Sequence, residues 1–598
     1  MTSYRAPLKD IRFVLDDYLA IDRYANLPRF ADAPAEVTDA ILEEGAKLLE
    51  KAIHPLNASG DVEGCTFANG VVTTPAGFRE AYNEYIEGGW GGLTADAEWG
   101  GQGMPRVLGL VFAEMMSSAN MAFGMYPGLT HGAYDAIEAH ASDELKRIYL
   151  PKLATGAWTG TMNLTEPHCG TDLGLLKTRA EPAADGSYRI TGTKIFISAG
   201  EHDLAPNIVH LVLARIAGAP EGIRGISLFI VPKFLVQPDG SLGARNGVAC
   251  GSIEEKMGIH ANATCVMNYD NAVGYLVGEP EKGMRAMFTM MNAARLGVGM
   301  QGLGVAEVAY QNAVIYTRER LQGRGLKGTE FPDKPADPII VHPDVRRMLM
   351  TMRAFIEGAR AFALDAGIKA DFAHSHPDPA VRREVEDYLA LVTPVIKSYF
   401  TEKGYEVATL AQQCFGGHGY IRETGMEQFV RDARIAMIYE GTNGIQALDL
   451  VGRKLGSHMG QLLRTFFHPI DRFIAERGTD PKIGKPFVQP LARAFAKLQQ
   501  ATAWIAEQGL RDPEEAGAAA DDYLELFGLV ALGYTWARMA ETASAKLADG
   551  GGEDKAFYEN KLITARFFME RMLPDTNALA LRVQAGKAAM MALPAEAF

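Results

Sequence analysis

Residues 413–444 read QCFGGHGYIRETGMEQFVRDARIAMIYEGTNG, and this stretch decides how the rest of the chain is interpreted. Glycines at 416, 417 and 419 form a turn almost without Cβ atoms, which lets a backbone lie against a flat or anionic ligand. The apolar run 435–439 ends at one acid, Glu440, and a second glycine turn follows. A carboxylate that is poorly solvated on one side has a raised pKa and can act as a general base near neutral pH. The alternative is an ordinary surface acid at a helix end.

Three elements follow one another here: GGHGY at 416–420, RDARI at 431–435 and YEGT at 439–442. Their order and separation resemble those of the flavin-dependent acyl-CoA dehydrogenases. In that family the glutamate of the YEGT element is the catalytic base, so the resemblance implies this role for Glu440. It implies substrate contacts for the neighbouring Tyr439 and Gly441. It also implies an oxidoreductase that uses FAD to convert an acyl-CoA thioester to the trans-2-enoyl-CoA.

The composition is that of a globular protein with several domains. The chain has 598 residues, of which 47% are hydrophobic and 22% charged. Its net charge of −14 argues against nucleic acid or an anionic membrane surface as a partner. Five scattered cysteines predict neither a metal cluster nor a disulfide framework, and they fit a reducing cytoplasm. We expect no signal peptide and no transmembrane helix, because no window comes near about 18 uncharged apolar residues.

Hydrophobic periodicity divides the chain into five parts. A short amphipathic segment covers 1–35, helical patterns cover 36–157, period-2 runs separated by turn residues cover 158–280, and long helical patterns return over 281–455 and 456–598. In the last part we expect helices over 487–507, 522–547 and 555–573, with loops over 514–520 and 549–553. The predicted class is α+β and mostly α. The resemblance covers about 36–455 and implies a helical domain, a β-barrel-like domain and a four-helix bundle, followed here by an extra C-terminal helical domain.

A second group of motifs lies in the β part. The run MNLTEPHCGTD at 162–172 resembles the family signature TEPxAGSD, and Phe-Ile-Ser at 196–198 corresponds to the family's W-I-T element, which covers the flavin ring. The resemblance implies cofactor contacts for Met162, Leu164, Thr165, Thr171, Phe196 and Ser198. Thr171 faces both the CoA and the flavin in this reading. Without the resemblance, Thr165 and Ser198 are plain hydroxyls of a β-sheet.

A third group concerns the rest of FAD and the surroundings of the base. Arg320 resembles the family arginine that reaches the FAD pyrophosphate of the neighbouring subunit, and a guanidinium suits a diphosphate because it donates in a planar fork. The resemblance implies FAD contacts for Gln413, Gly416, Gly417 and Thr442 as well. Arg295 resembles the arginine near the base. Some members place their catalytic glutamate at the position of Ala294, which cannot take a proton.

Several functions remain open within this family. The long bacterial members that the chain resembles most act on short acyl chains, including a thioether chain, while related long members are general fatty acyl-CoA dehydrogenases for medium or long chains. An acyl-CoA oxidase, which passes electrons to O₂, and a catalytically inactive assembly protein are further alternatives. The resemblance favours a cytoplasmic homodimer that passes electrons to electron-transferring flavoprotein. A homodimer follows because Arg320 must reach across a subunit boundary.

Overall fold

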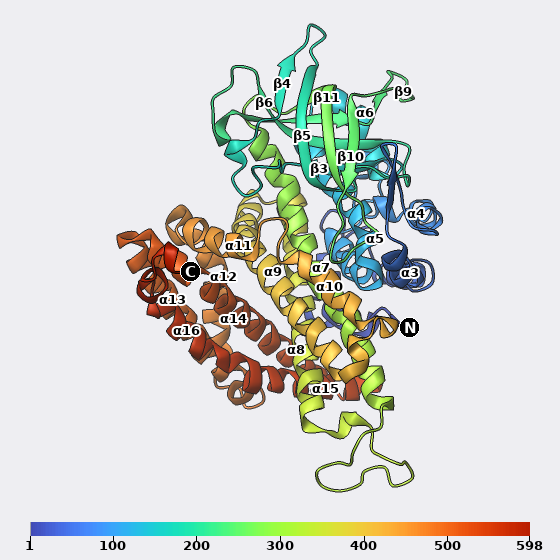
Figure 1. Cartoon of the computed structure of the whole chain (residues 1–598). Coiled ribbons are helices and arrows are strands. Elements are labelled where there is room, and N and C mark those ends of the chain that lie inside the picture. The colour runs from blue at the N-terminus through green and yellow to red at the C-terminus, as the bar shows by residue number, and fades with distance from the viewer. Residues whose placement is uncertain (1) are drawn as a thin grey trace. The chain divides into compact units, whose positions relative to one another are not determined.

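The computed structural model describes residues 2–598 (Figure 1). Contacts within the chain divide it into two compact units. One unit contains 43–297, and the other combines 2–42 with 298–598. Long helices dominate both ends of the chain, and one large sheet lies between them in the sequence. The predicted class, α+β and mostly α with an extra C-terminal helical part, is therefore confirmed.

Helices open the unit 43–297. They are α3 (Pro55–Glu63), α4 (Phe78–Glu87), α5 (Arg106–His140) and α6 (Asp143–Ala154), with a small hairpin of β1 (Thr66–Ala68) and β2 (Val71–Thr73). α5 is interrupted at Asn120, which has φ −163° and ψ 96°. The Oδ1 atom of Asn120 accepts a hydrogen bond from Phe123 N at 3.0 Å, so Asn120 caps the second half of the helix.

α5 is also a long and strongly apolar helix. Among residues 2–598 it is the one helix long and apolar enough to cross a membrane by length and composition, with 78% of its most apolar window buried in the fold. The prediction that no window comes near this limit was therefore wrong for α5. Its burial is that of a core helix, because its apolar side chains already have protein neighbours.

The sheet closes on itself. Its strands are β3 (Thr159–Asn163), β4 (Arg179–Pro182), β5 (Tyr188–Ser198), β6 (Ile208–Ile216), β7 (Ile226–Pro232), β10 (Val248–Ile253) and β11 (Thr264–Val277). The pairings run β11–β5–β4–β6–β7 and return to β11, with β10 added on β11 and β3 on β6. Figure 1 shows these strands in teal and green. A closed ring leaves no long unpaired edge.

β6 and β7 are apolar on both faces because each face belongs to a different core. Val209, Leu211 and Leu213 pack with α5 and α6, while Val212 and Ala214 pack inside the ring of strands. Successive side chains of a strand point to opposite sides, so a strand buried on both sides reads as a continuous apolar run.

Long helices form the other unit. α7 (Gly283–Glu319) enters it at residue 298, and α8 (Pro343–Ser375), α9 (Pro379–Cys414), α10 (Met426–Ala436) and α11 (Asn443–Asp449) follow. α7 and α9 approach closely at Gly302 and Gly404. A Cβ atom on Gly404 would lie 2.4 Å from the Gly302 carbonyl oxygen, so only glycine allows this crossing.

The C-terminal part of this unit contains α12 (Gln461–Arg477), α13 (Gln489–Arg511), α14 (Pro513–Ala548), α15 (Lys555–Phe567) and α16 (Thr576–Ala585). The prediction of a loop over 514–520 was wrong, because α14 already begins at Pro513. Asp512 Oδ1 accepts from Glu514 N at 3.0 Å, and proline stands at the first helical position. These are helix start signals, so the alanine-rich segment after them continues as helix.

A buried ionic cluster joins the N-terminal segment to the other helices of this unit. Asp10, in α1 (Leu8–Arg12), pairs with Arg360 of α8 and Lys561 of α15. Lys561 Nζ also lies 2.7 Å from Glu357, and Arg360 lies 2.5 Å from Glu307. Burial by itself raises the pKa of Asp10, but the charges of Lys561 and Arg360 hold it below its usual value.

Candidate active site

Glu440 lies in the turn between α10 and α11. Its backbone has φ +56° and that of Gly441 has φ +81°, so two successive residues adopt the left-handed region. For a glutamate this region is unfavourable, and such strain is common at functional sites. Glu440 is half-buried. The run 435–439 before it is less uniformly buried than its sequence suggests, since Ile438 is 46% exposed.

The residues on either side of Glu440 are held by side chains of the same unit. The Tyr439 hydroxyl donates to Gln301 Oε1, and burial raises the pKa of Tyr439. Thr442 Oγ1 accepts from Ile445 N at 3.3 Å and so caps α11. The Thr442 side chain is nevertheless exposed.

Sequence reasoning missed two buried residues, Gln446 and Asn443, whose hydrogen bonds hold this turn and the helix after it. Gln446 Nε2 donates to the carbonyls of Glu440, at 3.1 Å, and Gly441, at 3.2 Å. Asn443 Oδ1 accepts from the fully buried Lys397 at 2.9 Å. The spacing of these polar residues from the base was the available signal, but their burial could not be read from it.

The residues predicted to hold the flavin ring come from β3, the loop after it and β5. Met162, in β3, is half-buried, as are Leu164 and Thr165. Both of the latter use their carbonyls inside the protein, because Lys194 Nζ donates to Leu164 O at 2.9 Å and Ile195 N donates to Thr165 O at 3.0 Å. Contacts with a ligand are therefore left to their N–H groups and to the Thr165 hydroxyl.

Phe196 is the most unusual residue of this group. The pairing of β5 with β11 shifts register between Lys194 and Ile197, which places Phe196 in a bulge with φ +58°. Its side chain is 60% exposed. A strained aromatic side chain on the surface of an otherwise regular strand offers a ring face to a ligand. Ser198 ends the same strand and is half-buried, and Thr171 lies exposed in the loop before β4.

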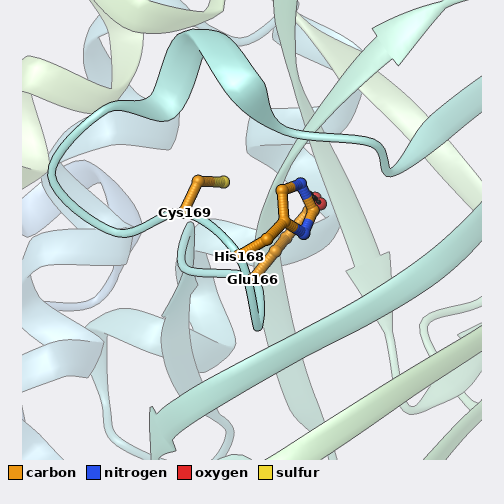
Figure 2. Close-up of side chains that lie close together, drawn as sticks. All are labelled: Glu166, His168 and Cys169. Carbon is orange, nitrogen blue, oxygen red and sulfur yellow. Dashed lines mark ion pairs between the residues drawn. The ribbon is translucent and has the colours of Figure 1, made fainter.

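The loop between β3 and β4 brings Glu166, His168 and Cys169 together, with one ligand atom from each within 4.8 Å of the others (Figure 2). The Glu166 carboxylate is already committed, since it accepts from Lys194 Nζ at 2.9 Å, Lys177 N at 2.7 Å and Thr178 N at 3.0 Å. Burial raises the pKa of Glu166, but the Lys194 charge and the hydrogen bonds from Lys194, Thr178 and Lys177 together hold it below its usual value.

The protonation of the other two members of this cluster makes them poor metal ligands. His168 Nε2 lies 2.9 Å from the Leu175 carbonyl, which can only accept, so that nitrogen carries a proton and has no lone pair for a metal. Figure 2 shows the Cys169 sulfur on the side that faces the imidazole, but burial raises the pKa of this thiol and so disfavours the thiolate that a metal would bind. The chemistry of the cluster is therefore that of a structural ion pair that shapes the loop.

Four of the residues predicted to reach the remainder of FAD lie in two segments that contact each other. Phe415 stacks on Tyr316 with ring centroids 4.0 Å apart, and Tyr316 Oη lies 3.3 Å from His418 Nδ1. This contact brings the end of α7, which Arg320 follows, beside the turn that contains Gly416 and Gly417. Arg320 and Gln413 are exposed.

The two glycines leave this turn open. A Cβ atom on Gly416 or Gly417 would meet no other atom of residues 2–598 within 4 Å. Only at residue 416, where φ is +58°, does the backbone conformation favour glycine. Gly417 has no packing reason in this chain to be glycine, which fits a surface against which a ligand lies.

The predicted set is thus divided between the two units. Glu440, Tyr439, Gly441, Thr442, Arg320, Gln413, Gly416 and Gly417 belong to the unit that contains 298–598, whereas Met162, Leu164, Thr165, Thr171, Phe196, Ser198 and the buried Arg295 belong to 43–297.

Models of known domain families cover most of the chain. The N-terminal domain of acyl-CoA dehydrogenase matches 36–157, the middle domain 161–272 and the C-terminal domain 281–455. A model described as acetyl-CoA dehydrogenase C-terminal like matches 466–594.

Curated relatives match over the whole length. The chain is 44% identical over 576 residues to a 3-methylmercaptopropionyl-CoA dehydrogenase of Ruegeria pomeroyi, covering 96% of this chain and 97% of that protein. It is 34% identical over 615 residues to a butyryl-CoA dehydrogenase of Syntrophomonas wolfei, covering 100% and 99%.

Solved structures share the fold. One is ACDH-11 of Caenorhabditis elegans in complex with C11-CoA, with a TM-score of 0.78, 19% identity and coverage of 98% of this chain and 95% of that one. Another is an acyl-CoA dehydrogenase of Bacillus anthracis complexed with FAD, with a TM-score of 0.74, 21% identity and coverage of 97% and 92%. Together with the family models and the relatives, they lead to one conclusion: the chain belongs to the acyl-CoA dehydrogenase family.

Proposed function

We propose that Glu440 is the base that removes the α proton in the dehydrogenation of an acyl-CoA thioester. The chain is a FAD-dependent acyl-CoA dehydrogenase. FAD, when bound, supplies the hydride acceptor that no side chain can provide. In the reaction the α proton passes to Glu440, the β hydrogen leaves as hydride, and the Cα–Cβ single bond becomes the trans double bond of the enoyl-CoA.

One observation carries the assignment of the base: the YEGT glutamate stands on a strained left-handed turn whose carbonyls are tied back into the protein. A surface acid needs no such support. The alternative position for a base in this family is Ala294, which has no carboxylate. Glu440 is therefore the one candidate among the two family positions.

We assign the flavin ring to Met162, Leu164, Thr165, Thr171, Phe196 and Ser198. The exposed ring of Phe196 and the committed carbonyls of Leu164 and Thr165 support this assignment, because they leave an aromatic face, N–H groups and a hydroxyl for the cofactor. We assign Arg320, Gln413, Gly416, Gly417 and Thr442 to the remainder of FAD. Arg320, Gln413, Gly416 and Gly417 are supported by their exposure in the two segments that the Tyr316–Phe415 stack brings together, and Thr442 by its exposed side chain in the turn after Glu440.

The preferred substrate is a short-chain acyl-CoA, and 3-methylmercaptopropionyl-CoA is the leading candidate. Two full-length relatives support a short chain, because one is named for that thioether substrate and the other for butyryl-CoA. Thr171, Arg295, Tyr439 and Gly441 are the proposed substrate contacts.

We further propose a cytoplasmic homodimer that passes electrons to electron-transferring flavoprotein. The motifs around Glu440 and Thr165, which resemble the dehydrogenases more than the oxidases, support this acceptor.

The test is reduction of the bound flavin by butyryl-CoA and by 3-methylmercaptopropionyl-CoA in anaerobic stopped flow. Glu440→Gln keeps the size of the side chain but cannot accept a proton, so its rate should fall by at least about 10²–10⁴-fold. Flavin content and substrate-induced spectral change should persist. Glu384→Gln, an exposed acid on α9, is the matched control and should behave as the parent. A Glu440→Gln rate within about tenfold of the parent, well short of a lost general base, would show that another group takes the proton.

A further inference from the structure

The backbone at Glu440 needs support from elsewhere in the chain. Glutamate at φ +56° is followed by Gly441 at φ +81°, and a non-glycine residue holds this conformation only when its surroundings impose it. A turn with this geometry is poorly determined by its own sequence. The contacts that impose it therefore also decide where the carboxylate points.

Gln446 makes the contacts that fit this role. Its side chain is fully buried, and its single amide nitrogen donates to two consecutive carbonyls, those of Glu440 and Gly441. The Oε1 atom of the same amide has no hydrogen-bond partner among residues 2–598. A position selected for packing alone favours an apolar side chain, because an unpartnered buried oxygen is unfavourable. The amide is retained for its two donors.

Gly441 is shaped to receive this amide. A Cβ atom at residue 441 would lie 2.6 Å from Gln446 Nε2, which is closer than any side chain permits. The glycine therefore serves two purposes, since it adopts the left-handed backbone and leaves room for the donor.

Asn443 fixes the helix from which Gln446 projects. Its Oδ1 accepts from Lys397 Nζ at 2.9 Å and from Thr401 Oγ1 at 3.2 Å, and its Nδ2 donates to Glu402 Oε2 at 3.0 Å. All three partners lie on α9. The first turn of α11 is thus fastened to a long helix, and Gln446, one turn along, is held at a constant distance from the carbonyls that it binds.

We propose that Gln446 is a positioning residue for the catalytic base: it locks the Glu440–Gly441 turn and so directs the carboxylate toward the substrate α carbon. This inference rests on the proposed role of Glu440. Gln446 does not itself touch the reacting atoms. Its effect belongs to the proton-transfer step and not to substrate affinity.

The test replaces Gln446 by methionine, which has a similar length and no donors. The matched control is Gln428→Met, a buried amide on α10 whose Nε2 donates to Asp432 at 3.3 Å. Flavin content, the Kd of butyryl-CoA and the rate of anaerobic flavin reduction are measured from acid to alkaline pH. We expect the reduction rate of Gln446→Met to fall by about 10–100-fold, because small misplacements of a reacting group have effects of this order. Flavin content and Kd should stay within about twofold of the parent, whereas the acid limb of the pH profile should move. Gln428→Met should show neither the fall in reduction rate nor the moved acid limb.

Gly441→Ala supplies an independent second variant, because its Cβ displaces the Gln446 amide. It should lose flavin reduction at least to the same extent, because its Cβ also strains a left-handed backbone at a proposed substrate contact. The double variant should lose little more than Gly441→Ala alone, since both changes break the contact between Gln446 and the turn. Parent-like reduction rates in either folded, flavin-loaded single variant overturn the inference, as do losses that simply add. If Glu440→Gln is itself parent-like, the proposed base fails; if it is inactive while Gln446→Met is parent-like, only the positioning role fails.

Discussion

Replacing Lys561 by methionine should destabilise the unit that contains residues 2–42 and 298–598. The ammonium group of Lys561 is buried beside Asp10 and Glu357, and its Nζ lies over the rings of Phe13 and Trp536, 4.9 Å and 5.7 Å from their centroids. Methionine has a similar length and can pack against the same rings. The substitution therefore removes the charge together with its ion pairs and its contacts over the rings.

The charge balance of the cluster sets the magnitude. Asp10, Glu307 and Glu357 face Arg353, Arg360 and Lys561, so three acids meet three bases. Removing one base leaves an uncompensated buried carboxylate, which typically costs about 3–5 kcal/mol. The unit has about 340 residues. With ~2.1 cal/mol/K per residue, its unfolding entropy is about 0.7 kcal/mol/K, so Tm should fall by about 4–7 °C.

Calorimetry at fixed protein concentration and saturating FAD measures this change, because both conditions alter apparent stability. Lys555→Met removes an exposed lysine from the same helix and should change the free energy of unfolding by less than about 0.5 kcal/mol. Adding Asp10→Asn to Lys561→Met restores neutrality and should recover at least half of the loss. A Tm within about 1 °C of the parent for Lys561→Met, well below the entropy-based figure, would refute the reasoning.

Other predictions follow from the proposed function and from the paired loop residues. Arg320→Ala should weaken FAD retention, measured by dialysis and absorbance, while the parent is a homodimer by light scattering; a monomer that binds FAD tightly contradicts this. Across an acyl-CoA panel, kcat/KM should be highest for short chains, and a steady rise to palmitoyl-CoA would indicate a general fatty acyl enzyme. Turnover should require a dye or electron-transferring flavoprotein, and stoichiometric peroxide without either would indicate an oxidase. Because the folded-state pKa of Glu166 is held below its usual value, its contribution to stability is complete above about pH 4.3 and is lost as pH falls through the lower folded value. Thermal melts from pH 7 to pH 3 should show this loss in the parent, and Lys194→Met, which removes the partner, should flatten it; an unchanged slope contradicts the pairing.

The sequence alone determined the order of the parts and the candidate base. Local patterns carry this information, because a period of 3.6 or 2 depends on a few consecutive residues. The strands β5, β6, β7 and β11 lie within 158–280, where the period of 2 was found, and the helices α8 and α9 lie within 281–455, where the helical period returned. The YEGT element likewise needs only four adjacent residues to be recognised. Start signals of a helix were readable too, but the pair Asp512 and Pro513 was overlooked, and α14 was therefore begun too late.

Tertiary structure alone decided which polar residues are buried and which groups they bind. Asp10 and Lys561 stand 551 residues apart, and only the packing of α1 against α15 brings them together. Gln446 lies close to Glu440 in the chain, yet its role depends on burial and on the fastening of Asn443 to Lys397. The closure of the sheet through β7 and β11 is of the same kind. The type of a residue fixes the chemistry of its side chain. The partners and the exposure of that side chain are decided only when distant segments pack around it and exclude water.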